Sequence, residues 1–322
     1  MADTDWDIPS NLQPNLDDYA FDLERALKSV VRLRVNVPSD AFTASALGTE
    51  RNGSGVVIGP DGLVLTIGYL ITEADTIWLI AQDGRAVAGH ALAFDQVTGF
   101  GLVQPLGRLD LPALDLAEAP LAVGAPAVLA AGGGRQFAIE TRVVGQQEFA
   151  GYWEYLLEEA LFTAPAHPFW SGAALIGHDG KLVGIGSLIL QQGEGKRRHD
   201  MNMIVPVSIL RPVLGELSTI GRLAAPPRPW LGLYVMENDG GLVVGGLADD
   251  GPAERAGVQA GDRVVGLGDQ DITDLGGLWR RLWGSGPAGV AVRLRLQRDS
   301  AEVVVRVTSA DRATFLRAPR LH

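Results

Sequence analysis

The sequence predicts a mainly β protein that ends in a smaller α+β domain. Short apolar or alternating runs recur about every ten residues, which is the rhythm of antiparallel strands. The 41 glycines favour many tight turns. A proline-rich stretch at residues 224–229 (AAPPRP) divides the chain and is expected to be a linker. A length of 322 residues suits two domains.

The composition excludes several classes of function. A formal net charge of −11 argues against nucleic-acid or anionic-lipid partners. The absence of cysteine excludes disulfides and thiolate zinc sites, and no cofactor is expected. The acidic N-terminus is unlike a signal peptide, and no apolar run is long enough to span a membrane. The sequence as given therefore predicts a cytoplasmic protein, or a periplasmic one if an export signal has been trimmed.

The first residues are expected to form a tail, one helix and a strand. Residues 1–15 are acidic and polar, and we expect a flexible tail there. Apolar residues at helical spacing predict a helix over residues 16–29. Alternation then predicts a strand at 30–37, and small polar residues predict a loop at 38–52.

Further strand-like runs fall into two sets separated by turn signals. The first set lies at residues 55–59, 63–67, 76–81 and 89–94. The second set lies at residues 125–132, 140–147, 159–164, 173–177, 182–190 and 201–207. This spacing favours an antiparallel barrel or sandwich. A helix is predicted over residues 207–221, because Gly221 supplies a stop signal.

The segment after the linker has the length of one small domain. Its pattern predicts, in order, two strands, a short helix, a strand, a longer helix and a terminal hairpin. These elements are expected at residues 230–236, 241–247, 250–258, 263–268, 274–284, 290–298 and 302–309.

This C-terminal segment resembles a PDZ domain from about residue 229 to 309. The run GPAERAGVQAGDRVV at residues 251–265 is similar, nearly position for position, to the family run G-S-P-A-x-x-A-G-L-x-x-G-D-x-I. The resemblance implies that the domain captures peptide or protein C-termini. The carboxylate-binding loop would be formed by Trp230, Leu231, Gly232 and Leu233.

Elementary geometry agrees with this role. Gly232 allows successive N–H groups to converge on one carboxylate, and residues 233–236 would offer an open strand edge to a peptide. Leu278 and Leu282 lie four residues apart on the predicted helix and would line the opposite wall of the groove. The alternative is that these side chains only form the core of the domain.

The preceding segment resembles the HtrA (DegP-like) serine proteases over roughly residues 30–221. The run GSGVVIGPDGLVLT is similar to the family run GSGVII-x-x-DGYILTNNHVV, but Tyr69 stands at the position of the catalytic histidine. Residues 95–103 are similar to D-x-x-T-D-L-A-L-L, with Gly99 at the position of the orienting aspartate. Residues 167–175 (HPFWSGAAL) are similar to N-P-G-N-S-G-G-P-L and keep the nucleophile position as Ser171.

The resemblance implies a fold and a domain layout. Two six-stranded antiparallel β-barrels of the trypsin type would occupy residues 16–223. After the linker, the PDZ domain would occupy residues 230–310, followed by a C-terminal tail at 311–322.

The chemistry of the three triad positions predicts a degenerate protease. A serine hydroxyl needs a base within hydrogen-bond reach, and the base needs an orienting group. The phenol of Tyr69 keeps its proton at neutral pH, and Gly99 has no side chain. Loss of the base alone costs roughly 10⁴ to 10⁶ in rate in subtilisin. By resemblance, the amides of Phe169 and Ser171 would form the oxyanion hole, and Phe169 replaces a family glycine there.

Two functional hypotheses follow. The first is a non-catalytic scaffold or adaptor that binds peptide or protein C-termini through its PDZ domain. The alternative is an active serine endopeptidase or esterase that uses Ser171 with an unconventional base. His167 lies four residues before Ser171, but Pro168 stiffens the intervening chain, so we expect a solvent-facing loop histidine. The resemblance also implies a homo-oligomer, with a trimer as the first expectation, and allows co-assembly with an active HtrA-type relative.

Overall fold

The computed structural model describes residues 8–193 and 199–318. They form two compact units. Of the described residues, the first unit contains 8–147, 159–193, 199–223 and 318, and the second contains 148–158 and 224–317. The prediction of a mainly β protein is confirmed by the strands below. None of the described helices is long and apolar enough to cross a membrane.

The first barrel is a closed six-stranded antiparallel sheet with the order β1-β2-β3-β6-β5-β4. Its strands are β1 (Val30–Asn36), β2 (Glu50–Val57), β3 (Val64–Ile67), β4 (Thr76–Ile80), β5 (Ala86–Phe94) and β6 (Phe100–Pro105). The sheet closes because β1 pairs with both β2 and β4. Alternate residues of β1 point inward, so Leu33 and Val35 are buried while Arg32 and Arg34 are exposed.

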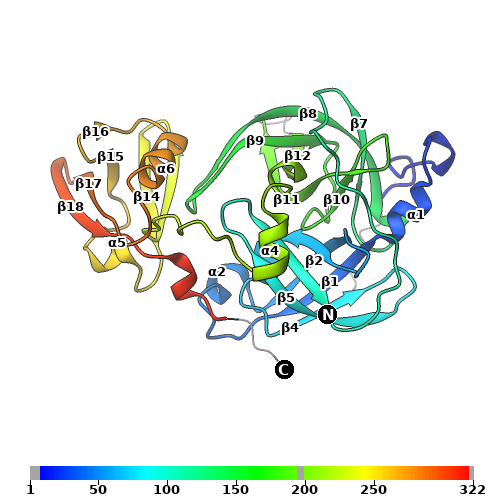
Figure 1. The fold of residues 1–322 in the computed structure, drawn as a ribbon. Coiled ribbons are helices and arrows are strands. Elements are labelled where there is room, and N and C mark those ends of the chain that lie inside the picture. Colours follow the sequence, from blue (N-terminus) through cyan, green and yellow to red (C-terminus); the bar gives the residue numbers. More distant parts are fainter. Residues whose placement is uncertain (1–7, 194–198, 319–322) are drawn as a thin grey trace. The chain divides into compact units, whose positions relative to one another are not determined.

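The second barrel is closed in the order β10-β11-β12-β9-β8-β7 (Figure 1). Its strands are β7 (Pro126–Ala130), β8 (Ala138–Gly151), β9 (Tyr155–Ala164), β10 (Ala174–Ile176), β11 (Leu182–Gln192) and β12 (His199–Pro206). The core contains Leu129, Ile139, Leu161 and Leu175. Strands β8 and β9 are neighbours that extend well beyond the predicted runs. The end of the hairpin that they form, residues 148–158, belongs to the second unit. We call residues 148–158 the hairpin tip.

The segment expected as a flexible tail packs on the second barrel over its described part, residues 8–15. Ile8 is buried in the barrel core. The Leu12 carbonyl accepts a hydrogen bond from the amide of Glu140, and Arg135 donates to the carbonyl of Pro14. Residues 1–7 lie outside the described residues.

Two of the predicted helices are interrupted. The helix expected over residues 16–29 consists of η1 (Leu16–Asp18) and α1 (Leu23–Lys28), because the Asp22 side chain accepts from the amide of Arg25 and caps a new start. The helix expected over residues 207–221 consists of η4 (Val207–Ile209) and α4 (Leu214–Ile220). Among the described residues of the first unit, the short helices α2 (Ala44–Leu47), α3 (Gly68–Ile71) and η2 (Arg135–Phe137) were not predicted.

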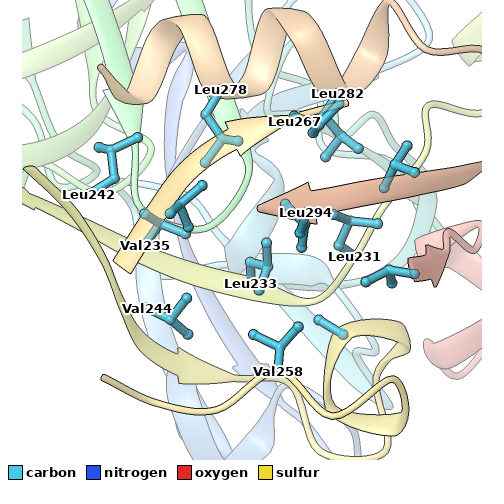
Figure 2. Close-up of a cluster of buried hydrophobic side chains, with 14 of the residues drawn as sticks. Leu231, Leu233, Val235, Leu242, Val244, Val258, Leu267, Leu278, Leu282 and Leu294 are labelled. Atoms are coloured by element: carbon cyan, nitrogen blue, oxygen red, sulfur yellow. The ribbon is translucent and has the colours of Figure 1, made fainter. Parts of the chain in front are cut away.

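The second unit is an antiparallel sheet covered by helices. Its strands follow the order β13-β14-β15-β17-β18, with β16 paired to β15. The elements are β13 (Leu233–Asn238), β14 (Gly241–Leu247), α5 (Pro252–Arg255), β15 (Arg263–Leu267), β16 (Gln270–Asp271), α6 (Leu275–Trp283), β17 (Ala291–Arg298), β18 (Ala301–Thr308) and η5 (Arg312–Phe315). Figure 2 shows the core, in which Leu278 and Leu282 of α6 lie over side chains of the sheet such as Leu294.

The second unit extends beyond the predicted domain at two places. The ring of Phe315 in η5 packs on the ring of Trp230, with centroids 4.9 Å apart, so the chain after residue 310 does not begin a free tail. The hairpin tip also belongs to this unit, and Leu156 of the tip lies in its hydrophobic core. Residues 319–322 of the expected tail lie outside the described residues.

Candidate catalytic site and peptide-binding groove

The structure brings Tyr69 and Ser171 into direct contact. Tyr69 lies on α3, and Ser171 lies in the turn before β10. The Tyr69 hydroxyl is 2.8 Å from Ser171 Oγ and 2.8 Å from the carbonyl oxygen of Ser187. A carbonyl only accepts, and the phenol has one proton, so Tyr69 donates to Ser187. The Ser171 hydroxyl must therefore donate its own proton to the phenol oxygen.

Tyr69 is a neutral phenol at physiological pH. Tyr69 as a whole is partly buried, and burial raises the pKa of its hydroxyl to about 12, against the lowering effect of the hydrogen bond with Ser171. At pH 7 only about one phenol in 10⁵ would be ionised. Tyr69 therefore holds Ser171 in place without acting as a base toward it.

The position of the orienting carboxylate is occupied by backbone. Gly99 has φ 82°, in the left-handed region that favours glycine, and its carbonyl accepts from the amide of Gly68 at 2.8 Å. The nearby Asp95 is buried, and its carboxylate accepts from the amide and hydroxyl of Thr98 at 2.9 and 2.6 Å. Asp95 is thus committed to its own turn.

The amide of Phe169 is also committed within the protein. It donates to Nδ1 of His167 at 2.9 Å, so His167 carries its proton on Nε2, which lies 2.9 Å from the carbonyl of Phe137 and donates to it. His167 is 0% exposed, and burial lowers its pKa to about 4. The expectation of a solvent-facing histidine is therefore wrong: His167 is a buried neutral side chain that fixes the turn before Ser171.

The Ser171 turn is closed tightly by backbone. Gly172 has φ 75°, and a Cβ at this position would lie 1.9 Å from the carbonyl oxygen of Ser54. The amide of Ser54 donates to the carbonyl of Ser171 at 2.8 Å, and the Ser54 hydroxyl accepts from the amide of Gly132 at 3.0 Å. Only glycine fits at position 172, which matches the resemblance to the protease loop.

Sequence reasoning missed a buried arginine behind Tyr69. Arg51 is 4% exposed and donates to the carbonyls of Tyr69 and Thr72 at 2.7 and 2.9 Å. It also reaches the hydroxyl of Thr43, which donates to the buried carboxylate of Glu73. Burial lowers the pKa of Arg51, and the charge of Glu73 opposes this shift. Arg51 anchors α3, and its signal in the sequence was a single basic residue in the predicted loop at 38–52.

A second candidate site lies in the predicted carboxylate-binding loop, residues 230–233. The Oε1 atom of Glu154 accepts from the amides of Leu231, Gly232 and Leu233 at 3.1, 2.7 and 2.9 Å. Gly232 has φ 78°, which turns successive N–H groups toward one point as predicted. Glu154 is 2% exposed, and burial raises the pKa of its carboxyl to about 7, while the three amides lower it.

The edge of β13 is also occupied, which corrects the prediction of an open edge. The amide of Val235 donates to the carbonyl of Tyr152 at 2.9 Å. From the opposite wall, the indole of Trp279 on α6 donates to the carbonyl of Gly151 at 2.9 Å. The hairpin tip therefore runs between β13 and α6, where the resemblance places a bound peptide.

The apolar residues predicted for the groove are brought together by the fold. Trp230 is 5% exposed, and each of the other four predicted groove residues with a side chain is at most 1% exposed: Leu231, Leu233, Leu278 and Leu282. All four leucines belong to one cluster (Figure 2). The same cluster contains Leu156 of the hairpin tip. With the tip in place they are core residues. No group of acidic and histidine side chains suited to a metal ion occurs among the described residues.

Two family models match the chain. A trypsin-like peptidase domain matches residues 53–185, and a PDZ domain matches residues 229–308. The chain is similar to the HtrA-type protease AlgW solved with a decapeptide, at 22% identity and a TM-score of 0.53, covering 92% of this chain and 98% of AlgW. It is similar to the serine endoprotease of Yersinia pestis at 21% identity and a TM-score of 0.53, covering 90% and 96%. At these identities the solved structures establish the fold.

Curated relatives extend the comparison. The chain is 27% identical over 270 residues to a DegP-like periplasmic serine endoprotease of Pseudomonas fluorescens, covering 80% of this chain and 55% of the relative. It is 25% identical over 268 residues to the serine endoprotease DegS of Haemophilus influenzae, covering 76% of each. The chain thus spans a little over half the length of the DegP-like relative. That relative is named periplasmic, so the expectation of a cytoplasmic location finds no support here. The chain is therefore a homologue of the HtrA-type proteases, with a trypsin-like peptidase domain followed by a PDZ domain.

Proposed function

We propose that this chain is a catalytically inactive HtrA-type protein that acts as an adaptor by binding peptide or protein C-termini. The observation that carries the loss of catalysis is the direction of the hydrogen bonds at Ser171. The phenol of Tyr69 donates its proton to the carbonyl of Ser187. The Ser171 hydroxyl therefore donates to the neutral phenol oxygen, which is too weak a base to remove the proton from Ser171. A protein with this arrangement cannot activate Ser171 as a nucleophile.

The surroundings of Ser171 support the same proposal. Gly99 provides no group to orient a base, and the buried His167 turns both ring nitrogens toward other partners. The amide of Phe169 donates to His167, so it is not directed at an oxyanion. The base, the orienting group and one oxyanion-hole donor are each replaced by a structural contact.

A fluorophosphonate probe tests the loss of catalysis on the purified full chain. The probe reacts with serines that a base and an oxyanion hole activate. We expect labelling no higher than that of the Ser171→Ala variant, under conditions that fully label an active trypsin-type protease. Labelling at Ser171 that this substitution abolishes would establish a serine hydrolase and overturn the proposal.

The convergent amides of residues 231–233 support capture of a carboxylate. They hold the carboxylate of Glu154 at hydrogen-bond distances, and a peptide terminus presents the same group. Fluorescein-labelled random decapeptides with free C-termini should therefore bind the full chain, while the same peptides with C-terminal amides should not. Equal binding of the free and amidated peptides would contradict carboxylate capture.

A further inference from the structure

The hairpin tip reproduces the contacts that a PDZ domain offers to a peptide. Its carbonyl at Tyr152 pairs with the edge of β13, and the side chain of Glu154 delivers a carboxylate to the loop. Leu156 buries its side chain in the cluster that contains Leu231 and Leu278. Backbone pairing, a carboxyl group in the loop and an apolar anchor are the three components of peptide recognition, and one segment of this chain supplies all three.

The tip is also fixed at its base and around its aromatic rings. Arg280 of α6 forms ion pairs with Glu148 and Glu158, one on each side of the tip. The rings of Trp153 and Tyr155 stack with centroids 5.8 Å apart, and the ring of Tyr152 meets that of Tyr234 on β13 at 6.2 Å. The contacts of Arg280 and Tyr234 come from opposite walls of the groove, while the Trp153–Tyr155 stack lies within the tip.

The backbone at Glu154 adds an independent indication. Glu154 has φ 60°, in the left-handed region that non-glycine residues adopt at a cost. Glycine or asparagine would adopt this conformation more easily, but neither carries a carboxylate that reaches the loop. The strained turn presents the side chain to three amides, so the conformation is maintained by the contact in the groove.

We propose that the hairpin tip is an intramolecular ligand of the PDZ groove, in which the Glu154 carboxylate takes the place of a peptide's terminal carboxylate. Peptide binding then requires the tip to leave the groove, because the amides of residues 231–233 and the edge of β13 cannot bind the tip and a peptide at the same time. This regulation rests on the proposed peptide-binding function. Removal of the carboxylate from the tip is expected to open the groove to peptides in trans.

Amide hydrogen exchange tests occupancy of the groove without any peptide. The full chain, Glu154→Ala and Glu154→Asn are compared by mass spectrometry over residues 230–236. Asparagine suits the left-handed turn and is too short to hold the loop, so Glu154→Asn keeps the turn if Glu154→Ala disturbs it. Glu159→Ala is the matched control, since Glu159 is an exposed glutamate of the same hairpin whose side chain accepts a hydrogen bond from Gln146 and makes no contact with the loop. Exchange at residues 231–233 should rise at least about tenfold in both Glu154 variants and stay unchanged in the control.

Peptide binding on the same variants separates this inference from the proposed function. Fluorescein-labelled random decapeptides with free C-termini should bind the Glu154→Asn variant at least about tenfold more tightly than the unchanged chain. Faster exchange without peptide binding to any variant would support the internal ligand and count against peptide capture. Equal exchange in all chains, or equal peptide affinity with and without the Glu154 carboxylate, would overturn the internal ligand while leaving peptide capture standing.

Discussion

Raising the pH from about 5 to about 8 should weaken the seating of the hairpin tip, because the docked Glu154 prefers its protonated form. Burial raises the pKa of its carboxyl to about 7 from the ordinary value of 4.5. Below pH 4.5 the carboxyl is protonated in both the docked and the released state, so its full contribution to docking is present. Between the two pKa values the released carboxyl ionises first, and the contribution is lost as the pH rises through about 7.

The difference between the two pKa values sets the magnitude. A gap of about 2.5 corresponds to about 3 kcal/mol, or about 300-fold in the docking equilibrium. About 70-fold of this change falls between pH 5 and pH 8. The neighbouring groups are Arg312 of η5, Tyr152 of the tip, and Tyr234 of β13 with Asp249 beside it.

Hydrogen exchange over residues 230–236 measures the effect, after correction for the intrinsic pH dependence of exchange. Protection of residues 231–233 should fall across this range in the unchanged chain and stay nearly flat in Glu154→Asn. That variant retains Asp249, so it separates the two carboxylates. Protection that rises with pH, or that falls equally in both proteins, would refute the assignment of the pH response to Glu154.

Two further predictions concern the peptidase domain. The double variant Tyr69→His with Gly99→Asp should still not be labelled by the fluorophosphonate probe, because the amide of Phe169 donates to His167 and not to an oxyanion. Labelling of the double variant would show that the Phe169 amide is dispensable. Arg51→Met should lower the free energy of unfolding in urea by about 3 to 5 kcal/mol, because it leaves the buried Glu73 carboxylate without the opposing charge of Arg51. Adding Glu73→Gln should recover part of that loss, and a double variant less stable than Arg51→Met would contradict the pairing.

The strands were largely predictable from the sequence. Alternation and turn signals located most barrel strands, because each strand buries one face and its pattern is local. Strand β6 was not assigned as a strand, since five of its six residues are buried and it shows no alternation. The break between η1 and α1 depends on the side chain of Asp22, which a periodic pattern does not weigh.

The candidate sites were predictable only where one residue decides the chemistry. Tyr69 and Gly99 are identified by resemblance to the protease motifs, and their residue types alone indicate that neither supplies a base or an orienting carboxylate. The burial of His167 depends on Phe137, thirty residues away, and the contact of Glu154 with Gly232 spans 78 residues. Such contacts leave no local pattern. The available signal was a cluster of aromatic residues in a segment that fitted no predicted strand, residues 148–158.

The hydroxyl of Ser171 has a consequence for how such chains evolve. The Ser171 carbonyl accepts a hydrogen bond from the amide of Ser54 in the first barrel. The Ser171 hydroxyl donates to the Tyr69 hydroxyl, which in turn donates to the carbonyl of Ser187 in the second barrel. Ser171 thus connects the two barrels through hydrogen bonds. Loss of its hydroxyl should lower the free energy of unfolding by about 1 kcal/mol, whether or not the chain cleaves a substrate. Selection for folding alone can therefore retain a serine at this position, independently of any catalytic role.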